Sequence, residues 1–145
     1  MKQFHLGVYG LIERGEEFLV VNKSRGPYKG LLDLPGGRPQ HGEEPFKTLK
    51  RELKEETGYV AAQWQEVGGP LYPNPARQTN RVYSFVATDL TKAGPQSLDT
   101  TEDIEFEFVS PTEVMNRIAK GDFRHALHVA CLFLAAEAAG MPGLK

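Results

Sequence analysis

The sequence has little of what marks secreted, membrane-bound or DNA-binding proteins. Its one cysteine, Cys131, excludes an intrachain disulfide. Its 17 lysines and arginines stand against 19 aspartates and glutamates, and the net charge of −2 disfavours sequence-independent binding to DNA. The longest strongly apolar run, residues 126–136, is too short to span a bilayer. We therefore expect a cytoplasmic protein without a membrane segment.

The remaining composition is that of an ordinary globular domain. Hydrophobic residues make up 40% of the chain and charged residues 25%, without an internal repeat or a low-complexity tract. A length of 145 residues suits one domain with a proper core, so we expect a single domain over residues 1–145. The N-terminal segment has one early lysine and no small-residue cleavage site, and we expect no signal peptide.

The most informative stretch begins at a glycine pair, Gly36 and Gly37, which follows a proline. Glycines at such a point let the backbone turn tightly and approach a ligand or a metal. Residues 43–57 then predict a helix. Pro45 suits its first turn, and Gly58 suits the left-handed position just after its end.

Wound at about 100° per residue, this helix has three faces. One is apolar, one carries lysines, and the third is acidic, formed by Glu52, Glu55 and Glu56. Like charges three and four residues apart destabilise an isolated helix. A hard divalent cation such as Mg²⁺, which binds carboxylate oxygens, is a good reason to keep them together. The alternative is a solvated acidic face on which Arg51 pairs with Glu55.

The spacing of this stretch resembles the Nudix box. Gly37 is followed after five residues by Glu43, and after seven more by the run Arg51-Glu52-Leu53-Lys54-Glu55-Glu56. One residue later come Gly58 and a position that is usually aliphatic. Tyr59 at that position is the one departure, and its ring is also able to be buried there. By this resemblance the chain is identified as a member of the Nudix hydrolase family.

The other elements follow from periodicity. Alternating apolar residues predict strands over 4–12, 17–22, 31–34, 59–67, 81–88 and 104–109. A second helix begins at Ser110 and Pro111 and ends near Gly121, and a last helix covers about 124–138. This order favours an α/β fold with a mixed sheet covered on both faces, and the resemblance implies the same α/β/α sandwich.

The last helix is apolar nearly all round between residues 126 and 136. It is therefore either deeply buried or shared with the second subunit of a homodimer. His125 and His128 lie three residues apart at its start, a spacing that a metal site also uses, but no third ligand is evident. We interpret them as core or interface histidines rather than as a zinc site.

The resemblance implies hydrolysis of a nucleoside diphosphate linked to another group, in which water attacks one phosphorus with the help of Mg²⁺, or of Mn²⁺ in its place. Carried over by the motif, the metal ligands are Glu52, Glu55 and Glu56 with the carbonyl of Gly36. Arg51 orients a carboxylate. The general base is Glu102, in a loop that leads into a strand, with Glu105 or a glutamate of the box as the alternatives.

The substrate is predicted from weaker features. The segment from Thr101 to Ala135 is similar to that of ADP-ribose pyrophosphatases, and so is a proline about fifteen residues after the box, Pro73 or Pro75. We predict ADP-ribose or a related nucleoside diphosphate sugar. Nucleoside triphosphates, including oxidised ones, are the alternative. The residues predicted to contact the rest of the substrate, by stacking or by binding phosphate, are Tyr28, Tyr72, Arg77 and Arg81.

A function of a different class is that of a nucleotide-binding sensor, which would have the same fold but catalyse no reaction. Such a protein needs no complete ligand set, so the presence of Glu52, Glu55 and Glu56 counts against it. A transcription regulator would need an added basic domain, and an RNA-end hydrolase a basic stripe that the sequence lacks. We therefore predict an enzyme whose partner is a small nucleotide.

Overall fold

The computed structural model describes residues 6–26, 29–77, 79–99 and 103–139. In chain order the elements are β1 (Leu6–Arg14), β2 (Glu17–Lys23), β3 (Leu32–Asp33), β4 (Gly36–Gly37), α1 (Pro45–Thr57), β5 (Tyr59–Leu71), β6 (Arg81–Lys92), β7 (Ile104–Val109), α2 (Pro111–Lys120) and α3 (Ala126–Ala138).

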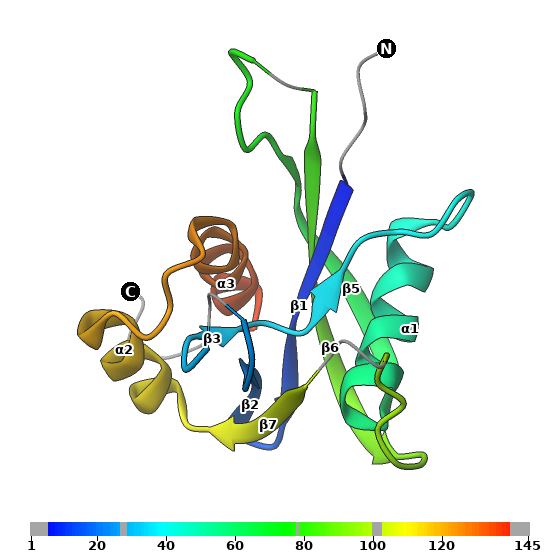
Figure 1. The fold of residues 1–145 in the computed structure, drawn as a ribbon, viewed down its shortest axis with the longest axis vertical. Helices are drawn as coiled ribbons and strands as arrows, with labels where there is room; N and C mark the ends of the chain where they lie inside the picture. Colours follow the sequence, from blue (N-terminus) through cyan, green and yellow to red (C-terminus); the bar gives the residue numbers. More distant parts are fainter. Residues whose placement is uncertain (1–5, 27–28, 78, 100–102, 140–145) are drawn as a thin grey trace.

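The strands form one mixed sheet in the order β3-β2-β1-β6-β5, with β4 paired to β1 and β7 paired to β2. β1 and β2 form the predicted antiparallel hairpin, in which Glu13 faces Phe18. β1 and β6 run parallel, and the other pairs are antiparallel. Figure 1 shows α1 on one side of the central strands and α2 with α3 on the other. The predicted α/β sandwich with a mixed sheet is therefore confirmed.

The helix α1 begins at Pro45, two residues later than predicted. A residue before proline avoids the helical conformation, and Glu44 is accordingly extended, with φ −72° and ψ 150°. Gly58 ends the helix in the left-handed conformation, and its N–H donates to the Lys54 carbonyl. The apolar face lies on the sheet as predicted, with Leu49 and Leu53 fully buried.

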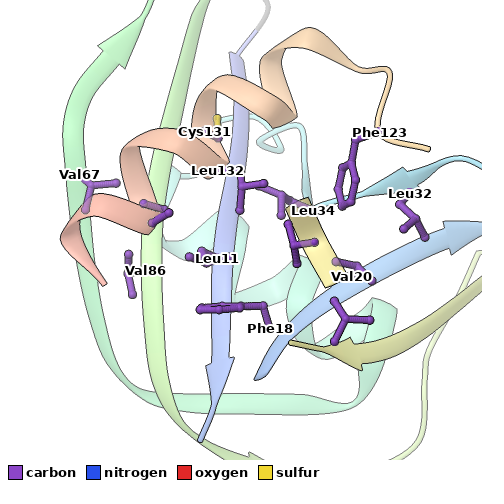
Figure 2. Close-up of a cluster of buried hydrophobic side chains, with 14 of the residues drawn as sticks. Leu11, Phe18, Val20, Leu32, Leu34, Val67, Val86, Phe123, Cys131 and Leu132 are labelled. Carbon is purple, nitrogen blue, oxygen red and sulfur yellow. The ribbon is translucent and has the colours of Figure 1, made fainter. Parts of the chain in front are cut away.

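The opposite face of the sheet is covered by α3. Figure 2 shows Cys131 and Leu132 of this helix among the apolar side chains of the sheet and of the β3 region, including Leu11 and Leu34. Cys131 is 1% exposed, and burial raises the pKa of its thiol, so it is the inert apolar side chain that its neighbours predict. Phe133 points away from this core and is 54% exposed.

Two strands are longer than predicted. β5 continues to Leu71 and β6 to Lys92, because the two strands pair with each other along their length. The register shifts between Val67 and Leu71, where Gly68 and Gly69 both adopt positive φ. The strand predicted to end at residue 67 therefore continues past these two glycines, which form an irregularity within it. In the described part of the chain, no helix has the length and apolarity needed to cross a membrane.

Candidate active site

The glycine pair and the C-terminal half of α1 meet at a cavity of about 360 Å³. Gly36, Gly37, Glu52 and Glu56 line one part of it. The rest is formed mainly by the sheet, by the residue after β4 and by the start of α3, including Tyr9, Lys23, Asp33, Arg38, His125 and His128. The cavity therefore joins the acidic face of α1 to residues from both ends of the chain.

Gly36 is held against both β1 and α1. It pairs with Tyr9 of β1, and its N–H donates to Glu56 Oε1 over 3.2 Å. Its φ of 148° is one that other residues rarely adopt, and a Cβ built on it would overlap the Val8 carbonyl oxygen. A glycine is therefore required here to bring the backbone next to the buried carboxyl group of Glu56.

Gly37 leaves space for Glu52. A Cβ at this position would lie 2.6 Å from Glu52 Oε1 and 2.7 Å from its carboxyl carbon. The missing side chain thus forms a recess that the carboxyl group of Glu52 occupies at the cavity wall.

Glu52 and Glu56 lie one helical turn apart and share a hydrogen bond. Burial raises the pKa of Glu52, because a carboxylate loses solvation there, although Glu56 and Arg51 oppose the shift. Two carboxyl groups beside a backbone carbonyl form a set of hard oxygen donors, and a divalent cation would relieve the cost of burying their charge. The residues present therefore fit Mg²⁺.

Arg51 binds the acidic groups together from the side. Its Nη1 donates to Glu52 Oε1 over 3.1 Å and to Glu55 Oε2 over 3.2 Å, while Nε and Nη2 donate to the two oxygens of Glu43. Nη2 also donates to the Arg38 carbonyl over 3.2 Å. Arg51 thus connects the loop after Gly37 to the acidic face of the helix.

Comparison with known protein families identifies the family to which this chain belongs. The model of the NUDIX domain matches residues 1–129. The chain belongs to the Nudix family. The structure is also similar to the crystal structure of an ADP compounds hydrolase, with a TM-score of 0.81 and 24% identity over 99% of this chain and 77% of that one. At that identity the likeness concerns the fold.

The relatives of this chain include proteins named for two different hydrolytic activities. An ADP-ribose pyrophosphatase of Methanocaldococcus jannaschii is 35% identical over 72 residues, which are 50% of this chain and 41% of the relative. A putative 8-oxo-dGTP diphosphatase of Bacillus subtilis is 33% identical over 101 residues, 70% of this chain and 62% of the relative. The Nudix chain therefore spans about half of the length of the curated relatives that it matches.

The Nudix box glutamates do not all face the cavity. Glu52 and Glu56 line it, whereas Glu55 pairs with Arg51, and its side chain is 41% exposed. Among the described residues, no three acidic, histidine or cysteine side chains are gathered into a ready metal cage. Arg51 Nη1 lies between the carboxyl groups of Glu52 and Glu55 and donates to both. The structure thus brings two of the three predicted glutamate ligands together with Gly36.

The predicted base and substrate residues are distributed differently. Glu102 and Tyr28 lie outside the described residues. Glu105 is exposed on β7, next to Ile104, which lines the cavity. Tyr72 and Arg77 are exposed in the loop after β5. Arg81 lies over the Tyr72 ring at 4.3 Å and donates to two carbonyls of its own loop, so both side chains hold this loop, outside the residues that line the cavity.

Most of the cavity residues could not be selected from sequence motifs. Tyr9 lies on β1, Lys23 at the end of β2 and Asp33 on β3, and none belongs to a motif. Burial raises the pKa of Tyr9 to about 12, so its hydroxyl keeps its proton. Arg38 stands directly after Gly37, and this position beside the glycine pair is the one signal that would have selected it.

The ion pair of Glu43 and Arg51 predicts a pH-dependent contribution to stability. The hydrogen bond from Arg51 lowers the pKa of Glu43 from 4.5 to about 2. The stabilisation that this ion pair provides is therefore complete above pH 4.5, the pKa of Glu43 in the unfolded chain. It is lost as the pH falls through about 2, the pKa of Glu43 in the folded protein. We expect Glu43→Gln to lower the free energy of unfolding by about 2 kcal/mol at pH 7, and by progressively less toward pH 2.

Urea denaturation of both proteins between pH 7 and pH 2.5 measures this difference. Glu66→Gln on β5 is a matched control, since Glu66 is an exposed glutamate. A Glu43→Gln difference that stays constant with pH would contradict the assignment.

Proposed function

We propose that this Nudix chain is a Mg²⁺-dependent hydrolase that cleaves the pyrophosphate of ADP-ribose or of a related nucleoside diphosphate sugar. The observation that carries the proposal is the meeting of Glu52, Glu56 and the backbone of Gly36 at one cavity. Hard oxygen donors around a cavity are suited to a cation that also binds phosphate oxygens. The Methanocaldococcus relative, named an ADP-ribose pyrophosphatase, supports the choice of substrate.

Glu52, Glu56 and the Gly36 carbonyl would hold the metal, with Glu55 completing the set if it leaves Arg51. Bound Mg²⁺ supplies charge neutralisation on the phosphate oxygens and lowers the pKa of a water ligand. Arg51 keeps Glu52 in place, and the Gly36 N–H does the same for Glu56.

Water attacks one phosphorus, a P–O bond forms, and the bridging P–O bond breaks so that the second phosphate leaves with the shared oxygen. The proton of the water passes to a general base. We propose Glu102 for this role, with Glu105 or a box glutamate as the alternatives, since a positioned carboxylate is the usual acceptor.

The rest of the substrate has space beside the carboxylates. A second cavity of about 640 Å³ shares Lys23, Asp33 and His125 with the first and adds the apolar side chains of Leu31 and Leu127. We place the non-reacting nucleoside there. Arg38 lines the first cavity, so its guanidinium is able to bind a phosphate there. Tyr72, Arg77 and Arg81 would then contact the substrate only if their loop folds over it.

A second candidate function is hydrolysis of nucleoside triphosphates, including oxidised ones. The Bacillus subtilis relative named a putative 8-oxo-dGTP diphosphatase matches 70% of this chain and favours it. The same carboxylates would serve this reaction.

We also propose a cytoplasmic location and a homodimer. The exposed Phe133 of α3 is the residue that a second subunit would cover.

A hydrolysis screen with Mg²⁺ tests the proposal. ADP-ribose and other nucleoside diphosphate sugars are compared with normal and oxidised triphosphates, and the products are identified by mass. We expect AMP and ribose phosphate from ADP-ribose. A monophosphate and pyrophosphate from a triphosphate would support the second candidate instead. No turnover with Mg²⁺ or Mn²⁺ would contradict both and favour a sensor. Glu56→Gln protein, purified in parallel, controls for contaminating hydrolases.

A further inference from the structure

His128 is a buried histidine with a defined partner. It lies on α3, is 3% exposed, and its ring packs at a tilt against the rings of Tyr9 and His125, with centroid distances of 4.0 Å and 4.1 Å. Burial lowers the pKa of His128 to about 3, with the charges of His125 and Lys23 contributing. The imidazole is therefore neutral, and one of its nitrogens is an acceptor.

That acceptor is used by the loop that carries the glycine pair. The backbone N–H of Leu34 donates to His128 Nδ1 over 2.9 Å, which joins residues 94 positions apart in the chain. The bond fixes the tautomer, with the proton on Nε2. Asp33 Oδ1 lies 3.4 Å from the same nitrogen, so the end of β3 and the residue after it both approach the ring.

The segment Leu34–Gly36 is held from three directions. The Leu34 N–H binds α3 through His128, the Pro35 carbonyl accepts from the Gly10 N–H of β1 over 3.1 Å, and the Gly36 N–H binds Glu56 of α1. Pro35 has no N–H of its own to donate. The bond to His128 therefore anchors this segment on its N-terminal side, two residues before the carbonyl of Gly36, next to Asp33, which pairs with Val21 of β2.

We propose that His128 is a positioning residue for the metal site: by holding the Leu34 N–H it sets the place of the Gly36 carbonyl relative to Glu52 and Glu56. The proposal rests on the proposed function, because it presupposes that these groups bind the cation. It extends the site to α3, on the face of the sheet opposite to the helix that supplies the carboxylates. Groups that orient metal ligands change metal affinity when they are removed, usually by about 10- to 100-fold.

Two substitutions separate the hydrogen bond from the packing. His128→Phe keeps a ring against Tyr9 and His125 but leaves the Leu34 N–H buried without an acceptor. His128→Asn loses ring packing but places an amide oxygen near the position of Nδ1. Leu132→Ala is the control, because it removes buried apolar atoms from the same helix without touching this bond.

The readout is Mn²⁺ affinity, measured by electron paramagnetic resonance titration without substrate, beside the melting temperature and kcat. We expect His128→Phe to weaken Mn²⁺ binding at least about tenfold and His128→Asn to restore it to within about threefold of wild type. Leu132→Ala should lower the melting temperature while Mn²⁺ affinity stays unchanged.

Wild-type affinity in His128→Phe, or equal losses in the Phe and Asn variants, would overturn the positioning role alone. If His128→Phe does not fold, the comparison of His128→Asn with Leu132→Ala decides: an Asn variant that binds Mn²⁺ as poorly as Glu56→Gln overturns the role. Wild-type protein that does not bind Mn²⁺ in a Glu56-dependent way would overturn the proposed function as well, and this outcome is distinguishable from the others.

Discussion

Glu56→Gln is expected to lower the rate of Mg²⁺-dependent hydrolysis by at least about a hundredfold. The carboxyl group is 4% exposed, lies at the cavity and accepts the N–H of Gly36. An amide of the same shape keeps an acceptor for that bond but loses the negative charge that the cation requires. A lost metal contact costs several kcal/mol of transition-state stabilisation, and each 1.36 kcal/mol is about tenfold in rate.

The measurement is kcat with the substrate found in the hydrolysis screen, together with the melting temperature of each protein. Glu66→Gln changes an exposed glutamate on β5 in the same way and should leave both quantities near wild type. If Glu56→Gln is folded and retains more than about a tenth of the rate, Glu56 is not a metal ligand, since several kcal/mol would then be missing.

Alanine at the two neighbouring glycines is expected to have different effects. Gly36→Ala should lower the free energy of unfolding by more than about 3 kcal/mol, because φ is 148° and the new Cβ would overlap the rigid backbone of Val8. Gly37→Ala meets the end of the Glu52 side chain at 2.6 Å, and this group is able to move. Its stability should fall by about 1 kcal/mol or less, while turnover falls about 10- to 100-fold because the carboxylate is displaced.

Chemical denaturation and kcat measured on the same preparations separate the two effects. Gly42→Ala is the control, since Gly42 also has positive φ, of 75°, but nothing lies within 4 Å of its Cβ position. The Gly42→Ala variant should show only the small loss of unfolding free energy that positive φ imposes on an alanine. A Gly37→Ala protein with wild-type turnover would show that the recess beside Glu52 does not matter for the reaction.

Local sequence was sufficient to predict the helices and strands and the glutamates that form one wall of the cavity. Period-two alternation located the strands, and caps such as Ser110 and Gly58 located the helix ends within a few residues. The spacing of the box placed Glu52 and Glu56 on one face, because four residues are close to one helical turn. The same spacing placed Glu55 on this acidic face as a predicted ligand, whereas in the structure its carboxyl group accepts a hydrogen bond from Arg51.

The opposite wall depends on contacts between distant residues. Tyr9, Asp33 and His128 come together because β1 lies in the middle of the sheet and α3 packs across it. The two histidines were interpreted from helical spacing as core or interface residues. Spacing within a helix contains no information about the loop that lies beside it, and the hydrogen bond from Leu34 to His128 was therefore missed.

The three anchors of residues 34–36 also have a consequence for synthesis on the ribosome. The box is translated long before residue 128, and α1 has its own caps and apolar face. The segment before Gly36 nevertheless lacks its partner until α3 has emerged and packed on the sheet. The nascent chain thus has all the glutamates of the box well before the backbone beside them is fixed, and the proposed metal site is completed only after α3 has packed.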